Sequence, residues 1–269
     1  MCYESFSVLE CIVYVCSKKC FSKYKYFSDS IILFKASNIL VSTGAPRNSA
    51  TRKTEIIDLL ANDDVTCQDI DDYPLEIEHS VASNIASFPV VICGGSHGAT
   101  RNQCYKLMEG GWQEFATMNS RRFGATGMVY GNLFHIFGGY DSSGSGELKS
   151  TEMINENGQV SQGPDLPTPL YHHAIATVNL STSILSGGIT GIHPNTNSNS
   201  PLTWYYNHAT QKFQVGPSLM GGRRHHASGT LVDQETNENI VAVVGGSVDD
   251  STELLLDGEW QEGKYHVRL

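Results

Sequence analysis

The 269-residue sequence lacks any apolar run long enough to cross a bilayer, which takes about 20 consecutive residues. We therefore expect no membrane span. The sequence also lacks an excess of basic residues, because 28 acidic residues oppose 18 lysines and arginines and leave a net charge of −10. This charge argues against bulk binding to nucleic acid or to an anionic membrane.

The N-terminus lacks a convincing secretory signal peptide. Its most apolar stretch, FSVLECIVYVC, contains Glu10, has no basic residue before it and has no small-residue cleavage site after it. We therefore expect a location inside the cell, with a secreted protein as the alternative.

An even set of cysteines is also missing. The seven cysteines are Cys2, Cys11, Cys16, Cys20, Cys67, Cys93 and Cys104. An odd number without a signal peptide favours reduced thiols over a disulfide framework. The spacing of the first four fits no established zinc motif.

Glycine, by contrast, is abundant at 26 residues, and part of it recurs in pairs. Four pairs each end a short apolar run: Gly94-Gly95, Gly138-Gly139, Gly187-Gly188 and Gly245-Gly246. Gly44-Ala45 is a degenerate copy, so the spacing between copies is 44 to 58 residues. A period of this size is typical of propellers and repeat arrays.

One copy, GGSHG at residues 94–98, also matches the nucleophile elbow of serine hydrolases. The glycines recur in the other copies and the serine does not. We therefore interpret Ser96 as a turn residue.

Each repeat contains four predicted strands. In RRFGATGMVYGNLFHIFGG, two apolar runs flank a turn at residues 130–132, and a third and a fourth run flank a turn at 156–158. The third run carries a recurring Thr-Glu pair, and the fourth carries Trp112 or Trp260 in two copies. Four antiparallel strands per repeat correspond to one propeller blade.

With these features the chain resembles the kelch-repeat family. The resemblance rests on the diglycines, the Thr-Glu strands, Trp112 and Trp260, and the R-x-x-A openings at Arg122 and Arg224. It implies an all-β, kelch-like β-propeller of four-stranded antiparallel blades. Gly44-Ala45, and Cys67 and Val160 near the tryptophan position, depart from the pattern and predict looser packing there.

We expect five repeats, at about residues 28–78, 79–120, 121–167, 170–219 and 222–263, within a domain at 28–269. Residues 1–27 are expected to be a poorly ordered, cysteine-containing tail. Relatives commonly have six or seven blades, so closure with five blades and an incomplete ring both stay open.

Propeller function lies in the loops and at the channel mouth, because the blades themselves pack. Aligned on the diglycines, the openings of the first strands are Ser28, His79, Arg122, Tyr171 and Arg224, with Arg121, His172, His173, Arg223, His225 and His226 beside them. In propellers of this kind, these openings resemble the positions that line the central pocket. Arginines at this channel mouth favour a carboxylate or an acidic peptide as the ligand. Alternatively, they pair with carboxylates of a neighbouring blade.

The sequence therefore predicts a non-enzymatic module that binds a protein or an acidic peptide through this mouth and through polar loops at 191–203 and 233–240. We identify no catalytic residue and no cofactor. We also expect no metal site, because adjacent residues on a strand point to opposite faces, so His172-His173 and His225-His226 each direct at most one ring inward. The alternatives are a secreted glycan-binding module, for which Asn179-Leu180-Ser181 would be a sequon, and a propeller enzyme of the galactose oxidase type.

Overall fold

The computed structural model describes residues 31–33, 38–42, 50, 52–58, 67–69, 71–83, 90–191, 199–233, 236–247 and 251–263, with backbone alone for 31–33, 38–42, 55–58 and 67–69. Within these ranges the chain is all-β, and no helix there could cross a membrane. The predicted tail at 1–27 and Ser28 lie outside the described residues.

The described residues form four-stranded antiparallel sheets, each with its strands in chain order. Sheet 1 contains β1 (Ile31–Leu33), β2 (Asn38–Ser42), β3 (Thr54–Asp58) and β4 (Cys67–Asp69). Sheet 2 contains β5 (Val81–Ala82), β6 (Val91–Cys93), β9 (Gln103–Met108) and β10 (Gly111–Thr117). Sheet 3 contains β11 (Thr126–Tyr130), β12 (Leu133–Phe137), β15 (Thr151–Asn155) and β16 (Val160–Gln162).

The remaining strands complete the pattern. Sheet 4 contains β17 (Ala174–Asn179), β18 (Thr182–Ser186), β19 (Thr203–Asn207) and β20 (Lys212–Val215). Sheet 5 contains β21 (Ala227–Val232), β22 (Asn239–Val244), β23 (Thr252–Leu256) and β24 (Glu259–Glu262). Two small hairpins, β7 (Ser96–His97) with β8 (Ala99–Thr100) and β13 (Tyr140–Asp141) with β14 (Gly146–Glu147), lie outside these sheets. The prediction of an all-β chain with four-stranded antiparallel sheets is confirmed.

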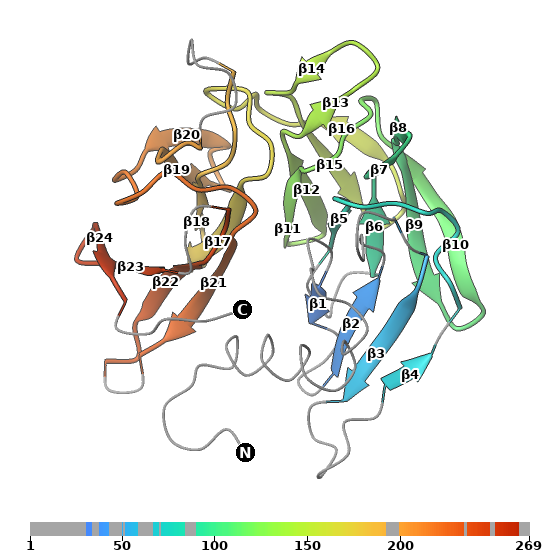
Figure 1. Cartoon of the computed structure of the whole chain (residues 1–269), viewed down its shortest axis with the longest axis horizontal. Coiled ribbons are helices and arrows are strands. Elements are labelled where there is room, and N and C mark those ends of the chain that lie inside the picture. Colours follow the sequence, from blue (N-terminus) through green and yellow to red (C-terminus); the bar gives the residue numbers. More distant parts are fainter. Residues whose placement is uncertain are drawn as a thin grey trace.

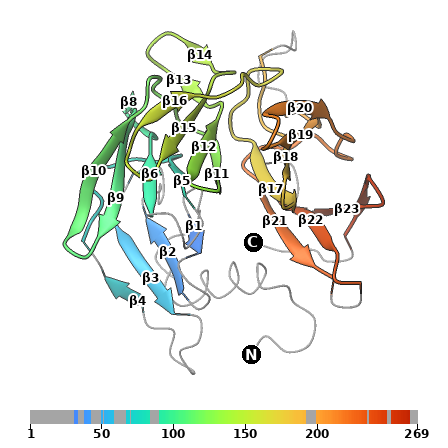
Figure 2. The same cartoon turned by 180° about the vertical axis from the view of Figure 1, so that it is seen from behind.

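The sheets stand side by side with their first strands toward the middle of the molecule and their fourth strands at the outside (Figures 1 and 2). The first strand β11 contacts both β5 and β17, and β17 contacts β21. Hydrophobic clusters fill the spaces between neighbouring sheets. One joins Val91 of sheet 2 to Phe134 of sheet 3, and another joins Ile184 of sheet 4 to Val243 of sheet 5. The second strands β6, β12 and β18 are therefore buried along nearly their whole length, whereas the fourth strands are largely exposed.

The diglycines end the second strands of sheets 2 to 5, and all eight glycines have positive φ, a conformation that costs glycine little. A Cβ on Gly94 would lie against the carbonyl oxygen of Arg122, so no larger residue fits there. Gly138 approaches the Leu170 carbonyl oxygen in the same way. The glycines thus allow each sheet to touch the start of the next.

The two tryptophans on fourth strands fasten their sheets to the preceding linker. The Trp112 indole N–H donates to the Asp71 carbonyl oxygen at 3.1 Å, and that of Trp260 donates to the Pro217 carbonyl oxygen at 3.0 Å. Trp260 is buried in the cluster between sheets 4 and 5.

Ser96 lies on the two-residue strand β7, which corrects its interpretation as a turn residue. Its amide donates to the Glu78 carbonyl oxygen at 2.9 Å. The strands β8 and β9 follow it, whereas a nucleophile elbow needs a helix directly after the serine.

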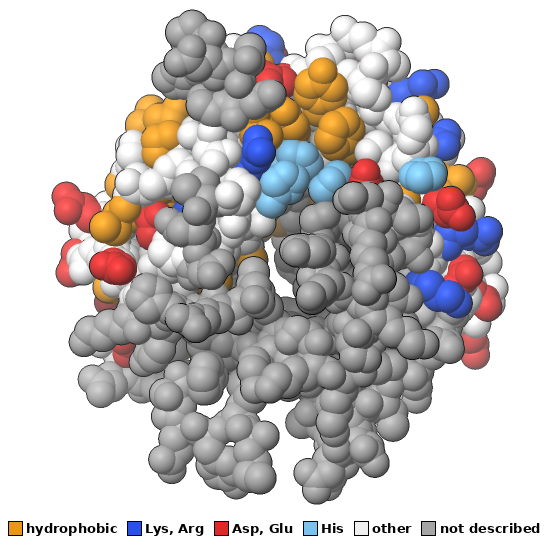
Figure 3. Space-filling view, viewed as in Figure 1, with side chains coloured by type: hydrophobic (Ala, Val, Ile, Leu, Met, Phe, Trp, Pro, Cys, Tyr) orange, Lys and Arg blue, Asp and Glu red, His pale blue; other side chains and the backbone are white. Residues whose placement is uncertain are grey.

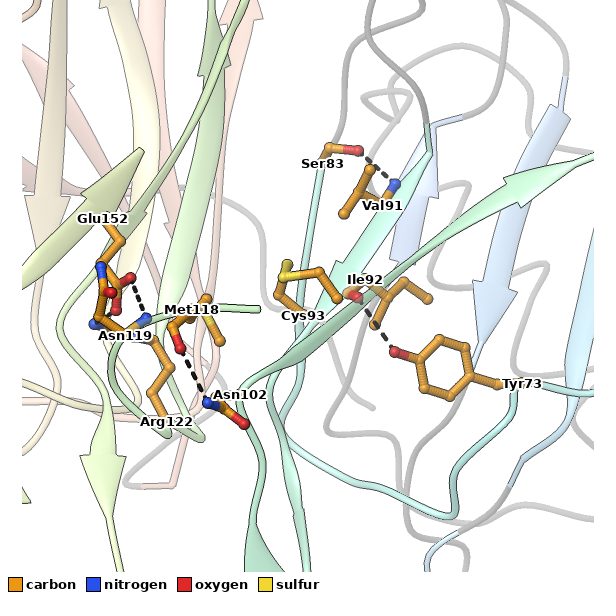
Figure 4. The surroundings of a disulfide bond; sticks show 11 residues. Tyr73, Ser83, Val91, Ile92, Cys93, Asn102, Met118, Asn119, Arg122 and Glu152 are labelled. Carbon is orange, nitrogen blue, oxygen red and sulfur yellow. Dashed lines mark hydrogen bonds and ion pairs between the residues drawn. A yellow bond between two sulfur atoms is a disulfide. The ribbon is translucent and has the colours of Figure 1, made fainter. Parts of the chain in front are cut away.

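The expectation of reduced cysteines is wrong for one pair, because Cys93 and Cys104 form a disulfide (Figure 4). They stand directly opposite each other on β6 and β9, with Cα atoms 4.1 Å apart. The pairing of β6 with β9, on either side of the β7–β8 hairpin, places the two cysteines opposite each other. The odd number of cysteines gave no indication of this pair.

We expect this disulfide to stabilise the protein by closing a loop with a sequence separation of 11 residues. Replacing both cysteines by valine should lower the free energy of unfolding by about 3 kcal/mol, measured by urea denaturation without reductant. Two titratable thiols at positions 93 and 104 in the purified parent protein would contradict the pairing.

Candidate functional site

Four residues occupy equivalent positions, two residues before the first strands of sheets 2 to 5: His79, Gly124, His172 and His225. All four have positive φ, between 53° and 61°. Their backbones are joined in series. The Gly124 amide donates to the His79 carbonyl oxygen at 2.8 Å, His172 to Gly124 at 2.7 Å, and His225 to His172 at 3.2 Å. The series brings residues far apart in sequence to one place.

The three imidazoles of this series form what we call the histidine cluster (His79, His172 and His225). The ring centroids of His172 and His225 lie 3.8 Å apart, and those of His79 and His172 lie 4.7 Å apart. His79 and His172 are half-buried and His225 is exposed. Histidine side chains gather near the middle of the face in Figure 3, beside hydrophobic side chains.

Gly124 provides the space that the cluster needs. A Cβ at position 124 would lie 2.8 Å from both Cε1 and Nδ1 of His172. Because Gly124 before sheet 3 has no side chain, the imidazole of His172 before sheet 4 fits beside it.

His172, one of the three members of the cluster, is held uncharged at neutral pH. Burial, followed by the neighbouring His225 and His79, His173 and Arg224, lowers the pKa of His172 to about 2. Burial likewise lowers the pKa of His173 to about 3, and that of His226 to about 3 with help from Arg223. A neutral imidazole keeps a lone pair with which it can accept a proton or bind a metal.

An aromatic rim (Phe123, Tyr140 and Tyr171) borders the histidine cluster. Ring centroids lie 5.4 Å apart for Phe123 and Tyr140 and 5.2 Å apart for Tyr140 and Tyr171. Tyr171 lies 4.9 Å from His172. The rim is thus continuous with the cluster.

The basic residues near this rim are Arg224 and Arg121. Arg224 is half-buried. Its charge adds to the burial that lowers the pKa of His172, and it opposes the burial that raises the pKa of Tyr171. Arg121 is exposed, and its charge helps to lower the pKa of Asp141. Of the acidic residues at the rim, Glu147 accepts a hydrogen bond from the Gly191 amide at 2.5 Å. Of the arginines predicted for the site, Arg224 therefore both acts on a histidine of the cluster and has part of its surface exposed.

Arg122 and Arg223 lie elsewhere, with exposed fractions of 1% and 3%. The Arg122 guanidinium donates to a Glu152 carboxylate oxygen at 2.6 Å and to the Gly138 carbonyl oxygen at 2.5 Å. Arg223 makes the equivalent bonds to Glu253 and to the Gly245 carbonyl oxygen. Each arginine pairs with a carboxylate of its own sheet, whereas the sequence alternative placed the carboxylate in a neighbouring blade.

The two buried carboxylates also hold the linker that precedes their sheet. Glu152 accepts from the Asn119 amide at 2.7 Å (Figure 4). It also accepts from the Ser120 amide at 3.0 Å. Glu253 does the same for the Met220 amide at 2.7 Å. The recurring Thr-Glu pair therefore supplies a structural ion pair in sheets 3 and 5.

The predicted ring of openings needs a correction. His79 stands two residues before its first strand, Tyr171 and Arg224 three before, and Arg122 four before. The sequence alignment counted back from the diglycines. Because the hairpins formed by the first and second strands differ in length, that count placed non-equivalent residues in one ring. Counting from the first strand instead would have aligned the three histidines and revealed the cluster.

Two predicted binding loops are described only in part, since residues 192–198 and 234–235 lie outside the described residues. Asn179 forms an exposed turn in which its side-chain oxygen accepts from the Ser181 amide at 3.0 Å. Leu180 at the tip is 95% exposed.

We expect Arg122→Met to lower the free energy of unfolding by about 3–5 kcal/mol, because Glu152 would keep a buried charge without its cation. The neighbouring Arg121 is exposed, so Arg121→Met should change stability by no more than about 0.5 kcal/mol. Urea denaturation of both variants makes the comparison. Equal, small effects would contradict a buried ion pair.

Comparison of the sequence with protein-family models and with curated proteins finds no match. The residues and contacts described above are therefore the basis for a function.

Proposed function

We propose that this chain is a kelch-like β-propeller that binds a partner protein or an acidic peptide, and that it is not an enzyme. The four-stranded antiparallel sheets, with first strands in contact and diglycines at the ends of second strands, support this fold. In such an architecture the sheets pack against each other, and recognition falls to the residues that open the first strands.

The observation that carries the proposal is the aromatic rim with Arg224 beside it. Tyrosine and phenylalanine supply rigid contact area, and arginine supplies a fork that holds a carboxylate bidentately. Arg224 is half-buried, so part of its side chain stays accessible to a ligand. Its Nε atom is buried and has no hydrogen-bond partner among the described residues.

The binding surface that we propose consists of His79, Tyr171, His172, Arg224 and His225, with Arg121 at its edge. Arg122 and Arg223 are left out because their guanidinium groups are buried against Glu152 and Glu253. This smaller surface is basic through Arg224, since burial keeps His172 uncharged at neutral pH through a lowered pKa.

The disulfide between Cys93 and Cys104 favours an oxidising compartment. We therefore prefer the secreted alternative to an intracellular location. In that compartment the exposed turn at Asn179 would be accessible to glycosylation.

The test is a comparison of peptides of equal length and apolar content that carry acidic, neutral or basic residues. We expect the acidic peptides to bind most tightly by fluorescence polarisation. Arg224→Gln should weaken them tenfold to a hundredfold, since a hydrogen bond to a charged group contributes about 1.5–3 kcal/mol.

Lys212→Gln is the matched control, because it removes one exposed positive charge from β20, the fourth strand of sheet 4, and leaves the proposed binding surface unchanged. Thermal melts of all three proteins check that they fold. The proposal fails if acidic peptides bind no better than neutral ones, or if both substitutions weaken binding equally.

A further inference from the structure

The histidine cluster has a geometry that partner binding does not require. One ring nitrogen of each of His79, His172 and His225 lies within 4.8 Å of the others. Among the described residues, this is the one group in which three or more potential ligand atoms of histidine, cysteine or carboxylate converge in this way.

Its members precede three different sheets, and each stands two residues before the first strand of its sheet. Sheet 3 has Gly124 at that place, which leaves room for the His172 ring. Positive φ is uncommon for a residue with a Cβ and strains its backbone. Three histidines at positions that suit glycine indicate that their side chains serve a function.

We propose that His79, His172 and His225 bind a divalent transition-metal ion, with Zn²⁺ as the preferred ion. Imidazole nitrogen is a common zinc ligand at about 2.0–2.1 Å, and tetrahedral geometry then places the nitrogens about 3.3 Å apart. The present separations of up to 4.8 Å exceed this value. Side-chain rotation can close the difference, most easily at His225, which is exposed.

Three protein ligands leave a tetrahedral ion one position for water or an anion, as in zinc sites that bind substrates. Arg224 lies close enough to His172 to lower its pKa, so an anion at the fourth position would meet a second positive charge. The ion would also link sheets 2, 4 and 5 at their inner ends. The binding of metal does not depend on the peptide proposal and can be tested without any peptide.

The experiment titrates the full-length protein with Zn²⁺ after chelator treatment and alkylation of free thiols, in competition with a chromophoric chelator. We expect one ion per chain with a dissociation constant of about 1 μM or tighter. His172→Ala and His225→Ala should each weaken binding by at least about a hundredfold, more than the loss of a supporting partner costs.

His97→Ala is the matched control, because His97 is an exposed histidine outside the cluster whose ring lies 3.7 Å from Glu76. It should bind Zn²⁺ like the parent. The melting temperature should rise with Zn²⁺ in the parent and in this control, and stay unchanged in the two cluster variants, each of which must give a cooperative melt.

Co²⁺ provides a second measurement that does not rely on the variants. Nitrogen and oxygen ligation should give the visible bands of tetrahedral Co²⁺ without thiolate charge-transfer absorption. Binding that survives both cluster substitutions, thiolate bands, or no binding of either ion would overturn the proposal.

Discussion

The fold depends on one repeated backbone interaction, in which the second glycine of the pairs in sheets 2, 3 and 4 donates its amide hydrogen to a carbonyl oxygen at the opening of the next sheet. Gly95 bonds the Arg122 carbonyl oxygen at 2.9 Å, Gly139 that of Leu170 at 2.8 Å, and Gly188 that of Arg223 at 2.8 Å. The approach is possible because the first glycine has no Cβ to strike the same carbonyl. These bonds fix how each sheet meets its neighbour.

The histidine cluster follows from that constraint. Once the openings of sheets 2 to 5 are held together, the residues two before their first strands become neighbours and bond through their own backbones. Their side chains then meet, whatever the distance between them in the sequence. The buried pairs of Arg122 with Glu152 and Arg223 with Glu253 hold the linkers that lead into this region. Stability and the candidate site therefore share one framework.

Local patterns predicted the strands well. Diglycines, the turns at 130–132 and 156–158 and the Thr-Glu strands depend on neighbouring residues, which a sequence displays directly. The pairing of Cys93 with Cys104 depends on register across an inserted hairpin, and the cluster depends on counting from each first strand. Arg122 and Arg121 look alike in the sequence, yet one is buried and the other exposed, because the guanidinium of Arg122 turns inward to Glu152 and to the Gly138 carbonyl oxygen.

The most direct test of this account is amide hydrogen exchange of Gly95, Gly139 and Gly188, measured by NMR under native conditions. If their hydrogen bonds join the sheets, these amides should exchange only through global unfolding, with protection that matches the free energy of unfolding. Gly131, in an exposed hairpin turn, should exchange far faster. Exchange of the three amides as fast as that of Gly131 would contradict the account.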